Sequence, residues 1–248
     1  MSKKTNYSYI GIAFIMLVFG IIFIPKIIDR MSKGDVTRDE SRSEEVSVNA
    51  GKKASDLAYI PLSGENRKVP PFSFTDQHGN TITNEDYLGK VYVVEFFFTT
   101  CPTICPRMNR NLVDIQDEFK AFENFGIASF TINPDYDTQD VLKAYAEKYG
   151  VINPNWHFMT GKEEDIYNLA NIGFNIYAGK NAEAEGGFEH SGNFALIDKE
   201  GYIRSRKDAH GNPMIYYIGV ISEAEGEEDG QKEQISILKE DIAKLLKE

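Results

Sequence analysis

Cysteine is scarce in this chain of 248 residues, which holds only Cys101 and Cys105, four positions apart. Small disulfide-stabilised domains carry more cysteines at wider spacings, so that class of protein is excluded. A bond between cysteines this close in sequence would not join distant segments. The pair therefore indicates chemistry, either as a redox couple or as metal ligands.

Positive charge is also in short supply, because 27 Lys and Arg face 38 Asp and Glu, for a net charge of −11. Nucleic-acid binding depends on clustered Lys and Arg, so no nucleic-acid partner is expected. We find neither an internal repeat nor a glycine-rich phosphate loop, and Gly186-Gly187 is interpreted as a turn. The acidic stretch 223–233 is expected to be a solvated loop.

The N-terminal part of the chain predicts a membrane anchor. Residues 9–24 carry no charge, and the apolar run reaches residue 28 if Pro25 and a snorkelling Lys26 are allowed for. About twenty residues is the length that a spanning helix needs. A cleaved signal peptide is the alternative, but the run is long for one and no small-x-small cleavage site follows it.

Four parts of the chain are expected. They are an N-terminal tail at 1–8, a transmembrane anchor at 9–28, a flexible polar linker at 29–57 and a globular domain at 58–248. Basic residues flank the anchor on both sides, so the positive-inside rule does not decide its orientation. The N-terminus lacks the character of a mitochondrial presequence, which favours a bacterial protein.

The globular part alternates predicted strands and helices. Buried strands are predicted at 91–98 and 126–133, hairpins at 72–83 and 194–204, and helices at 106–122, 139–149, 163–172 and 235–245. Because a closing hairpin follows the alternating strands and helices, the pattern indicates an α/β fold with a mixed sheet flanked by helices.

Cys101 and Cys105 follow the first buried strand, at its junction with a helix. A helix N-terminus lowers a thiol pKa, and thiolate is both the nucleophile and the metal ligand. If both cysteines lie in the first helical turn, the i, i+4 spacing places both sulfurs on one face. Their Cα atoms would then be ~6 Å apart, within the range that a disulfide tolerates. The pair can thus act as a redox couple or bind one soft ion.

Two thiolates need further ligands to complete most metal sites. Zinc prefers four ligands, whereas two sulfurs and one imidazole suit three-coordinate copper. The candidates for a third donor are His78, His157, His190, His210 and the thioether of Met108. His190 lies at a loop edge before a strand, whereas the other histidines and Met108 read as surface or packing residues. Spacing alone leaves the choice open.

Four motifs occur in series along the chain. They are YVVEFFFTTCPTICP at 92–106, TINPDYDT at 131–138, WHFMTG at 156–161 and EHSGNFALID at 189–198. In this order they closely resemble the SCO/SenC family of cytochrome c oxidase assembly proteins. The family signature is an aromatic strand, then Thr, one residue and Cys-Pro-x-x-Cys-Pro. The resemblance covers about residues 70–204.

The resemblance implies a thioredoxin-like domain on a single N-terminal anchor, on the periplasmic side of the bacterial inner membrane. It also implies copper, as Cu(I) or Cu(II), held by Cys101, Cys105 and His190. The implied function is to deliver copper to the binuclear copper site of cytochrome c oxidase, or to reduce the cysteines of that site. The implied partner is the copper-bearing oxidase subunit, with other copper chaperones or thiol reductants as further partners.

The family pattern is not complete. Asn133 stands where the family usually has Asp, and Glu189 replaces the Asp before the histidine. Both changes leave the sulfur and imidazole donors intact, but any further role of those acids is open.

Three other functions compete with this interpretation. A general periplasmic thiol–disulfide oxidoreductase usually carries Trp-Cys-x-x-Cys, whereas here the spacing is one residue longer and no Trp precedes Cys101. A peroxidase would need a Pro-x3-Thr-x2-Cys element, which is absent. A copper store or sensor is the third. We therefore expect mainly a metallochaperone, with thiol–disulfide reductase activity as a second property of the redox pair Cys101 and Cys105.

Overall fold

The computed structural model describes residues 16–19, 21, 23–25, 57–62, 65–208 and 210–248. The predicted tail at 1–8 lies outside these residues, as do most of the predicted anchor at 9–28 and all but the last residue of the predicted linker. Within the described ranges, no helix is long and apolar enough to cross a membrane. The chain divides into two compact units, Met1–Lys52 and Lys53–Glu248, and the second is described below.

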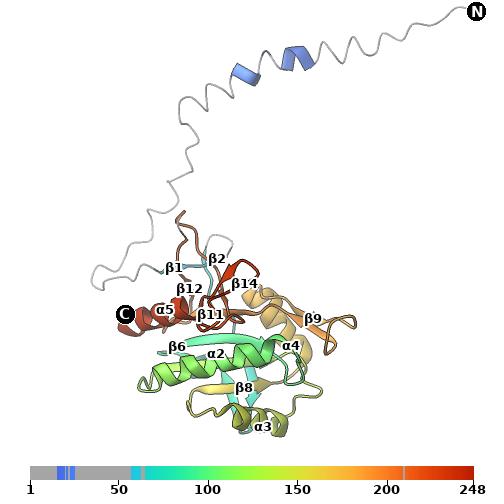
Figure 1. The fold of residues 1–248 in the computed structure, drawn as a ribbon, viewed down its shortest axis with the longest axis vertical. Helices are drawn as coiled ribbons and strands as arrows, with labels where there is room; N and C mark the ends of the chain where they lie inside the picture. The colour runs from blue at the N-terminus through green and yellow to red at the C-terminus, as the bar shows by residue number, and fades with distance from the viewer. Residues whose placement is uncertain (1–15, 20, 22, 26–56, 63–64, 209) are drawn as a thin grey trace, which may run out of the picture. The chain divides into compact units, whose positions relative to one another are not determined.

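A mixed sheet forms the centre of this second unit (Figure 1). In spatial order its strands are β1 (Ala58–Tyr59), β12 (Ile203–Ser205), β11 (Asn193–Ile197), β6 (Val91–Phe97), β7 (Phe125–Thr131), β8 (Trp156–Thr160), β4 (Ser73–Asp76) and β5 (Thr81–Thr83), and β13 (Tyr217–Ile218) pairs with β11. Strands β6, β7 and β8 are parallel, and the other neighbouring pairs are antiparallel. The predicted mixed sheet is confirmed.

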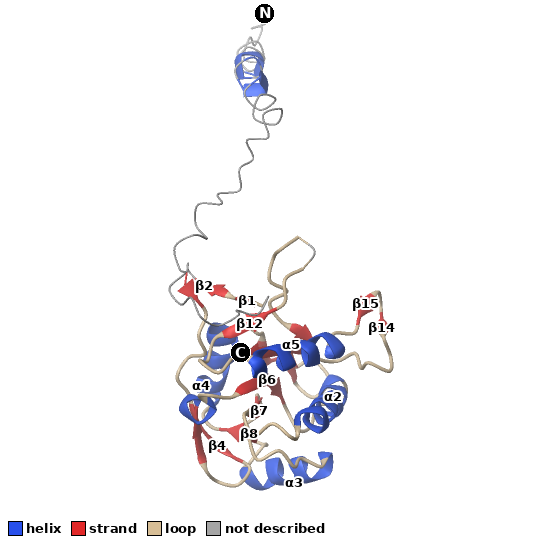
Figure 2. Ribbon diagram, turned by 90° about the vertical axis from the view of Figure 1, so that its left-hand side faces the viewer, coloured by secondary structure: helices blue, strands red, loops and turns tan. Residues whose placement is uncertain are grey.

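Helices cover both faces of the sheet (Figure 2). One face carries α2 (Ile104–Phe119), α3 (Gln139–Tyr149) and α5 (Ile235–Lys247), and the other carries α4 (Glu163–Asn168) followed by a π-helical turn, η3 (Leu169–Phe174). Successive strand residues point to opposite faces. Accordingly, Phe97 of β6 stacks on Tyr145 of α3, whereas Phe96 contacts Phe174 of η3.

The remaining elements are short. They are the hairpins β2 (Pro61–Leu62) with β3 (Glu65–Asn66), β9 (Ala178–Lys180) with β10 (Phe188–His190), and β14 (Glu227–Glu228) with β15 (Gln231–Lys232), and the 3-10 helix η2 (Asn84–Tyr87). The stretch 223–233 is largely exposed, as predicted for a solvated segment. It nevertheless contains the ordered hairpin β14–β15, which the sequence pattern does not indicate.

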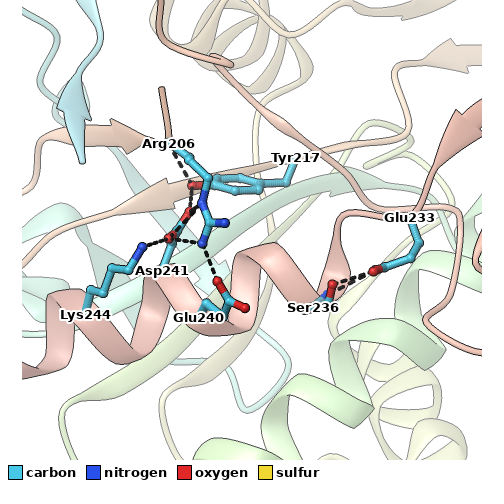
Figure 3. Close-up of polar contacts among 7 residues, drawn as sticks. All are labelled: Arg206, Tyr217, Glu233, Ser236, Glu240, Asp241 and Lys244. Carbon is cyan, nitrogen blue, oxygen red and sulfur yellow. Dashed lines mark hydrogen bonds and ion pairs between the residues drawn. The ribbon is translucent and has the colours of Figure 1, made fainter. Parts of the chain in front are cut away.

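The C-terminal helix α5 is fixed at its middle and at its start, as Figure 3 shows. The buried carboxylate of Asp241 accepts hydrogen bonds from the Arg206 guanidinium at 2.7 and 3.0 Å and from the Tyr217 hydroxyl at 2.9 Å. At the start of the helix, the Glu233 carboxylate accepts the Ser236 N–H at 3.0 Å and the Ser236 hydroxyl. The contacts of Asp241 attach α5 to the segments around β12 and β13, whereas those of Glu233 are local to the start of the helix.

Candidate metal and thiol site

Three separate elements supply the predicted site residues. Cys101 lies in the turn after β6, Cys105 in the first turn of α2, and His190 at the end of β10. Parallel β6 and β7 end at the same edge of the sheet, and open α/β sheets bind ligands at this edge. The topology thus brings Cys101 and Cys105 to a position where ligands commonly bind.

Only one of the two cysteines lies in the helix, contrary to the arrangement considered from the sequence. Helix α2 begins at Ile104, and Cys101 lies in a turn in which its N–H donates to the Phe98 carbonyl at 3.2 Å. The physical reason is visible in the sequence, because Pro102 disfavours a helical conformation at the residue before it. Pro106, in contrast, lacks only an N–H that the first turn of a helix does not use.

The ligand atoms of Cys101, Cys105 and His190 all lie within 4.8 Å of one another. The Cys105 sulfur is 3.1 Å from Nε2 of His190, and the Cys105 N–H points to the Cys101 sulfur at 3.5 Å. All three residues are buried, with exposed fractions of 6% for Cys101, 0% for Cys105 and 8% for His190. Two sulfurs and one imidazole nitrogen therefore converge in an enclosed space.

The imidazole of His190 has a defined tautomer. Its Nδ1 is 3.1 Å from the Ser191 carbonyl oxygen, which only accepts hydrogen bonds, so Nδ1 carries the proton. In the neutral ring, Nε2 then keeps its lone pair and directs it toward the cysteines. A carbonyl that fixes the far nitrogen is typical of metal-binding histidines.

The two thiols differ in acidity. Hydrogen bonding with Cys105 lowers the pKa of Cys101 to about 3 despite partial burial. Burial and the neighbouring Cys101 raise the pKa of Cys105 well above its ordinary value. The pair therefore carries one negative charge, on Cys101, and the proton stays on Cys105.

A cavity of about 270 Å³ opens onto the site. Cys101 and His190 line it, together with Phe98, Thr103, Ile104, Ala184, Glu185, Phe188 and Glu189. Cys105 is not among the lining residues and is wholly buried. A partner or an ion that enters the cavity therefore meets Cys101 and His190 first, and Cys105 lies beneath them.

The other candidate donors do not join this group within the described part of the chain. His78 and His210 are exposed, and His157 places Nδ1 3.1 Å from Asp76. Met108 is fully buried in the hydrophobic core. Each of them has a surface or packing environment, as their sequence positions suggested.

The two residues that depart from the family pattern have different surroundings. Glu189 lines the cavity and accepts a hydrogen bond from the Asn181 amide at 3.0 Å. Asn133 follows β7, where its N–H donates to the Thr131 hydroxyl at 3.1 Å. Neither residue interrupts the group formed by the two sulfurs and the imidazole.

Two buried carboxyl groups near the site were not singled out from the sequence. Glu95 is fully buried in β6, and Asp137 is fully buried in the loop between β7 and α3. Glu95 could have been noticed as an acid within the otherwise uncharged run 91–98. Asp137 lay within a quoted motif, but nothing in the sequence showed that it is buried.

A model of the SCO1/SenC family matches residues 61–220. The SCO1 protein homologue of Bacillus subtilis (strain 168) is 34% identical to this chain over 161 residues, which cover 64% of this chain and 81% of that protein. A protein of Stutzerimonas stutzeri whose name describes copper binding is 29% identical over 156 residues, covering 60% of this chain and 73% of its own.

Two solved structures are similar to this one. A SCO1/SenC family lipoprotein from Bacillus anthracis str. Ames has a TM-score of 0.60 at 28% identity, covering 73% of this chain and 95% of its own. BsSco is described as a member of the Sco family of cytochrome c oxidase assembly proteins with a disulfide switch. It has a TM-score of 0.58 at 27% identity, and the match covers 73% of this chain and 94% of BsSco. The expected thioredoxin-like fold, with helices around a mixed sheet, is confirmed.

Proposed function

Because this chain belongs to the SCO1/SenC family, we propose that it is a copper-binding factor in the assembly of cytochrome c oxidase. In this proposal Cys101, Cys105 and His190 hold the copper. The main support is the meeting of their two sulfurs and one imidazole within 4.8 Å, in a family where one relative is named for copper binding.

The donor set suits copper better than zinc. Soft thiolates select Cu(I), and neutral imidazole is a good ligand for either oxidation state of copper. A structural zinc site usually has four protein ligands. Among the described residues, no fourth His, Cys, Asp or Glu belongs to this group.

The three residues play different parts in binding. Cys101 is already a thiolate and faces the cavity, so it is the first donor that an incoming copper ion meets. Cys105 must release its proton, because only thiolate is a strong ligand. His190 is held by the Ser191 carbonyl with its Nε2 lone pair toward the sulfurs, which lets it complete a three-coordinate site.

Reduction of a partner's cysteines is the second candidate function. The accessible thiolate of Cys101 would attack a partner disulfide and form a mixed disulfide. Cys105 would then displace the partner, closing the Cys101–Cys105 disulfide, while its proton passes to the departing thiolate. The partner gains two electrons, and its first-released thiolate takes a second proton from water, which leaves a dithiol. A thiolate that lines the cavity, with a second thiol beneath it, favours this sequence, and BsSco is described as having a disulfide switch.

We also infer that the domain lies outside the cytoplasm at the bacterial inner membrane, where a copper-bearing oxidase subunit would be its partner. The apolar run 9–28 would serve as a single-pass anchor and 29–57 as its linker to the domain at 58–248. One similar structure is described as a lipoprotein, which supports attachment to a membrane.

Replacement of His190 tests the proposed function. A disulfide needs only two sulfurs and an oxidant, whereas three-coordinate copper also needs the imidazole. His190→Ala should therefore weaken copper affinity at least about tenfold, most of all for Cu(II), because a whole ligand is removed. The cysteines should still oxidise and reduce. Competition titrations with copper chelators, thiol counts after redox cycling and cellular oxidase activity measure these three properties.

The combined results separate the two candidate functions. Weak copper binding with lost oxidase activity would support copper delivery, and partial recovery on added copper would support it further. Weak copper binding with normal oxidase activity would leave thiol reduction as the better account. Unchanged copper affinity would contradict the proposed site. His78→Ala is the matched control, because His78 is exposed and outside the group.

A further inference from the structure

A buried carboxylate joins the ends of the two central strands at the edge that carries the site. Asp137 is 0% exposed and lies in the loop between β7 and α3. It accepts hydrogen bonds from the Thr99 N–H at 3.1 Å, from the Thr99 hydroxyl and from the Thr131 hydroxyl. Thr99 follows β6, and Thr131 is the last residue of β7.

Burial of this carboxylate is costly without a cation. No ion pair to Asp137 is seen in the part of the chain that the structure describes. Burial raises the pKa of Asp137, and only the hydrogen bonds from Thr131 and Thr99 oppose that effect. Only these three converging donors offset the free energy lost by burying the Asp137 carboxylate, which indicates a specific structural role.

The role of Asp137 follows from the position of its partner Thr99 in the chain. Thr99 lies two residues before Cys101, inside the turn that the bond from the Cys101 N–H to the Phe98 carbonyl closes. Asp137 is itself held, because its N–H donates to the Asn133 carbonyl at 2.9 Å. A continuous set of hydrogen bonds therefore runs from the end of β7 to the turn that carries the Cys101 sulfur.

This turn needs an external support. Cys105 is fixed by helix α2, and His190 by its place in hairpin β9–β10 and its bond to the Ser191 carbonyl. Cys101 belongs to neither a helix nor a strand, and loop residues move more than the elements they connect. We propose that Asp137 is the positioning residue of the site, which holds Cys101 through Thr99 at the correct distance from Cys105 and His190.

This inference rests on the proposed function, because the positioned sulfur is one of the proposed copper ligands. Partners that orient metal ligands without touching the metal usually contribute about 10–100-fold to affinity. Asp137→Asn keeps the shape of the side chain but replaces one acceptor oxygen with an amide that faces N–H and O–H donors. We expect this variant of the full-length chain to bind copper about 10–100-fold more weakly than the wild type.

Asp76→Asn is the matched control. Asp76 is also 0% exposed, and its carboxylate accepts backbone N–H bonds from His78 at 2.9 Å and Asn80 at 2.8 Å. It lies on β4, three strands away from β6 in the sheet. Asp76→Asn should therefore lose stability without losing copper affinity, which separates positioning from general destabilisation.

Thr99 offers a second pair of variants in case Asp137→Asn does not fold. Thr99→Val removes the hydroxyl donor and keeps the backbone bond, whereas Thr99→Ser keeps both donors. We expect Thr99→Val to weaken copper binding less than Asp137→Asn does, and Thr99→Ser to bind copper like the wild type. Equal copper affinity in Thr99→Val and Thr99→Ser would oppose the inference.

Two measurements on the same variants keep this inference distinct from the proposed function. Copper affinity is measured first, and the midpoint potential of the Cys101–Cys105 disulfide is measured in glutathione buffers without copper. Shifts in Asp137→Asn but not in Asp76→Asn support positioning. Wild-type values for both quantities in Asp137→Asn overturn it, while the copper site stands. If the wild type binds no copper, the proposed function fails, and the disulfide potential alone decides about Asp137.

Discussion

Charged side chains are held differently in two regions near the site. One is the interior, at the buried strand β6, and the other is the rim, the partly exposed surface where α2 meets hairpin β14–β15. In the interior, Glu95 of β6 is fully buried, and one of its oxygens accepts the Ser129 hydroxyl at 2.6 Å. Its other oxygen has no hydrogen-bond partner within the described residues. On the rim, Arg107 of α2 is partly exposed and contacts Glu228 at 2.7 Å and Glu225 at 3.2 Å.

The difference shows in the acidities of the two regions. Burial raises the pKa of Glu95 to about 8, so this carboxyl is mostly neutral at neutral pH. Hydrogen bonds from Ser222, and then from Arg107, lower the pKa of Glu225 to about 2, so that carboxyl is charged. The Glu95 carboxyl is therefore mostly neutral and the Glu225 carboxyl charged, and substitutions in the two regions should differ in the size of their effects.

The largest effect is expected from Glu95→Gln, through its dependence on pH. Unfolded Glu95 titrates near 4.5 and folded Glu95 at about 8, so the folded state binds more protons between these values. Wild-type stability should fall as pH rises through this window, by up to about 1.4 kcal/mol per pH unit from this group, and level off above pH 8. Glu95→Gln should lack this contribution.

Urea unfolding of both proteins at pH 5, 6, 7 and 8 measures the difference directly. Other groups, such as His157, titrate in both proteins and cancel in the comparison. The stability of Glu95→Gln relative to the wild type should increase with pH. A difference that stays constant from pH 5 to 8 would show that Glu95 is not held neutral by burial.

An effect of intermediate size is expected from Gly186→Ala, in the exposed turn of hairpin β9–β10. Gly186 has a φ of +86°, and a Cβ there would lie 2.8 Å from the Phe98 ring, which contacts His190 edge-on. Gly187 has a φ of +81° but an open surrounding. Gly186→Ala should cost about 1–3 kcal/mol of stability and weaken copper binding, because Phe98 must move.

Gly187→Ala is the matched control for the backbone strain. It should cost about 1–2 kcal/mol and leave copper affinity unchanged, because no side chain is displaced. Thermal unfolding and copper competition on both variants give the two quantities. Equal copper affinities in the two variants would mean that Phe98 does not transmit the strain to His190.

The smallest effect is expected on the rim, from Arg107→Ala. Partly exposed ion pairs contribute little to stability and are screened by salt. The variant should keep the unfolding midpoint and the copper affinity of the wild type at physiological ionic strength, even though Arg107 lies only two residues from Cys105. A large loss of copper affinity would show that hairpin β14–β15 supports the site, and the contrast between interior and rim would then be wrong.

The sequence predicted most of the fold because apolar periodicity is strong in the sheet. The run 91–98 became β6, and the hairpin around the turn 198–201 became β11–β12, closed by the bond from the Gly201 N–H to the Asp198 carbonyl. The predicted helix at 163–172 is instead a short α-helix followed by a π-helical turn. Periodicity does not reveal such an insertion, because the apolar residues still recur along the segment.

The candidate site was predictable in its members but not in its supports. Cys101 and Cys105 stand out by their spacing, whereas His190 was selected by resemblance rather than by any local pattern. Asp137 and Glu95 escaped notice because an acidic residue normally lies at the surface, and only the fold shows that these two are buried. Hairpin β14–β15 was missed because its exposed charges carry no periodic signal.

Copper titration of the reduced full-length chain and of Cys105→Ser tests the central claim most directly. The wild type should bind one copper per chain, since Cys101, Cys105 and His190 form a single group among the described residues. In Cys105→Ser a hard, protonated hydroxyl replaces a soft thiolate, so tight binding should be lost. One tightly bound copper retained in Cys105→Ser would contradict the proposed site.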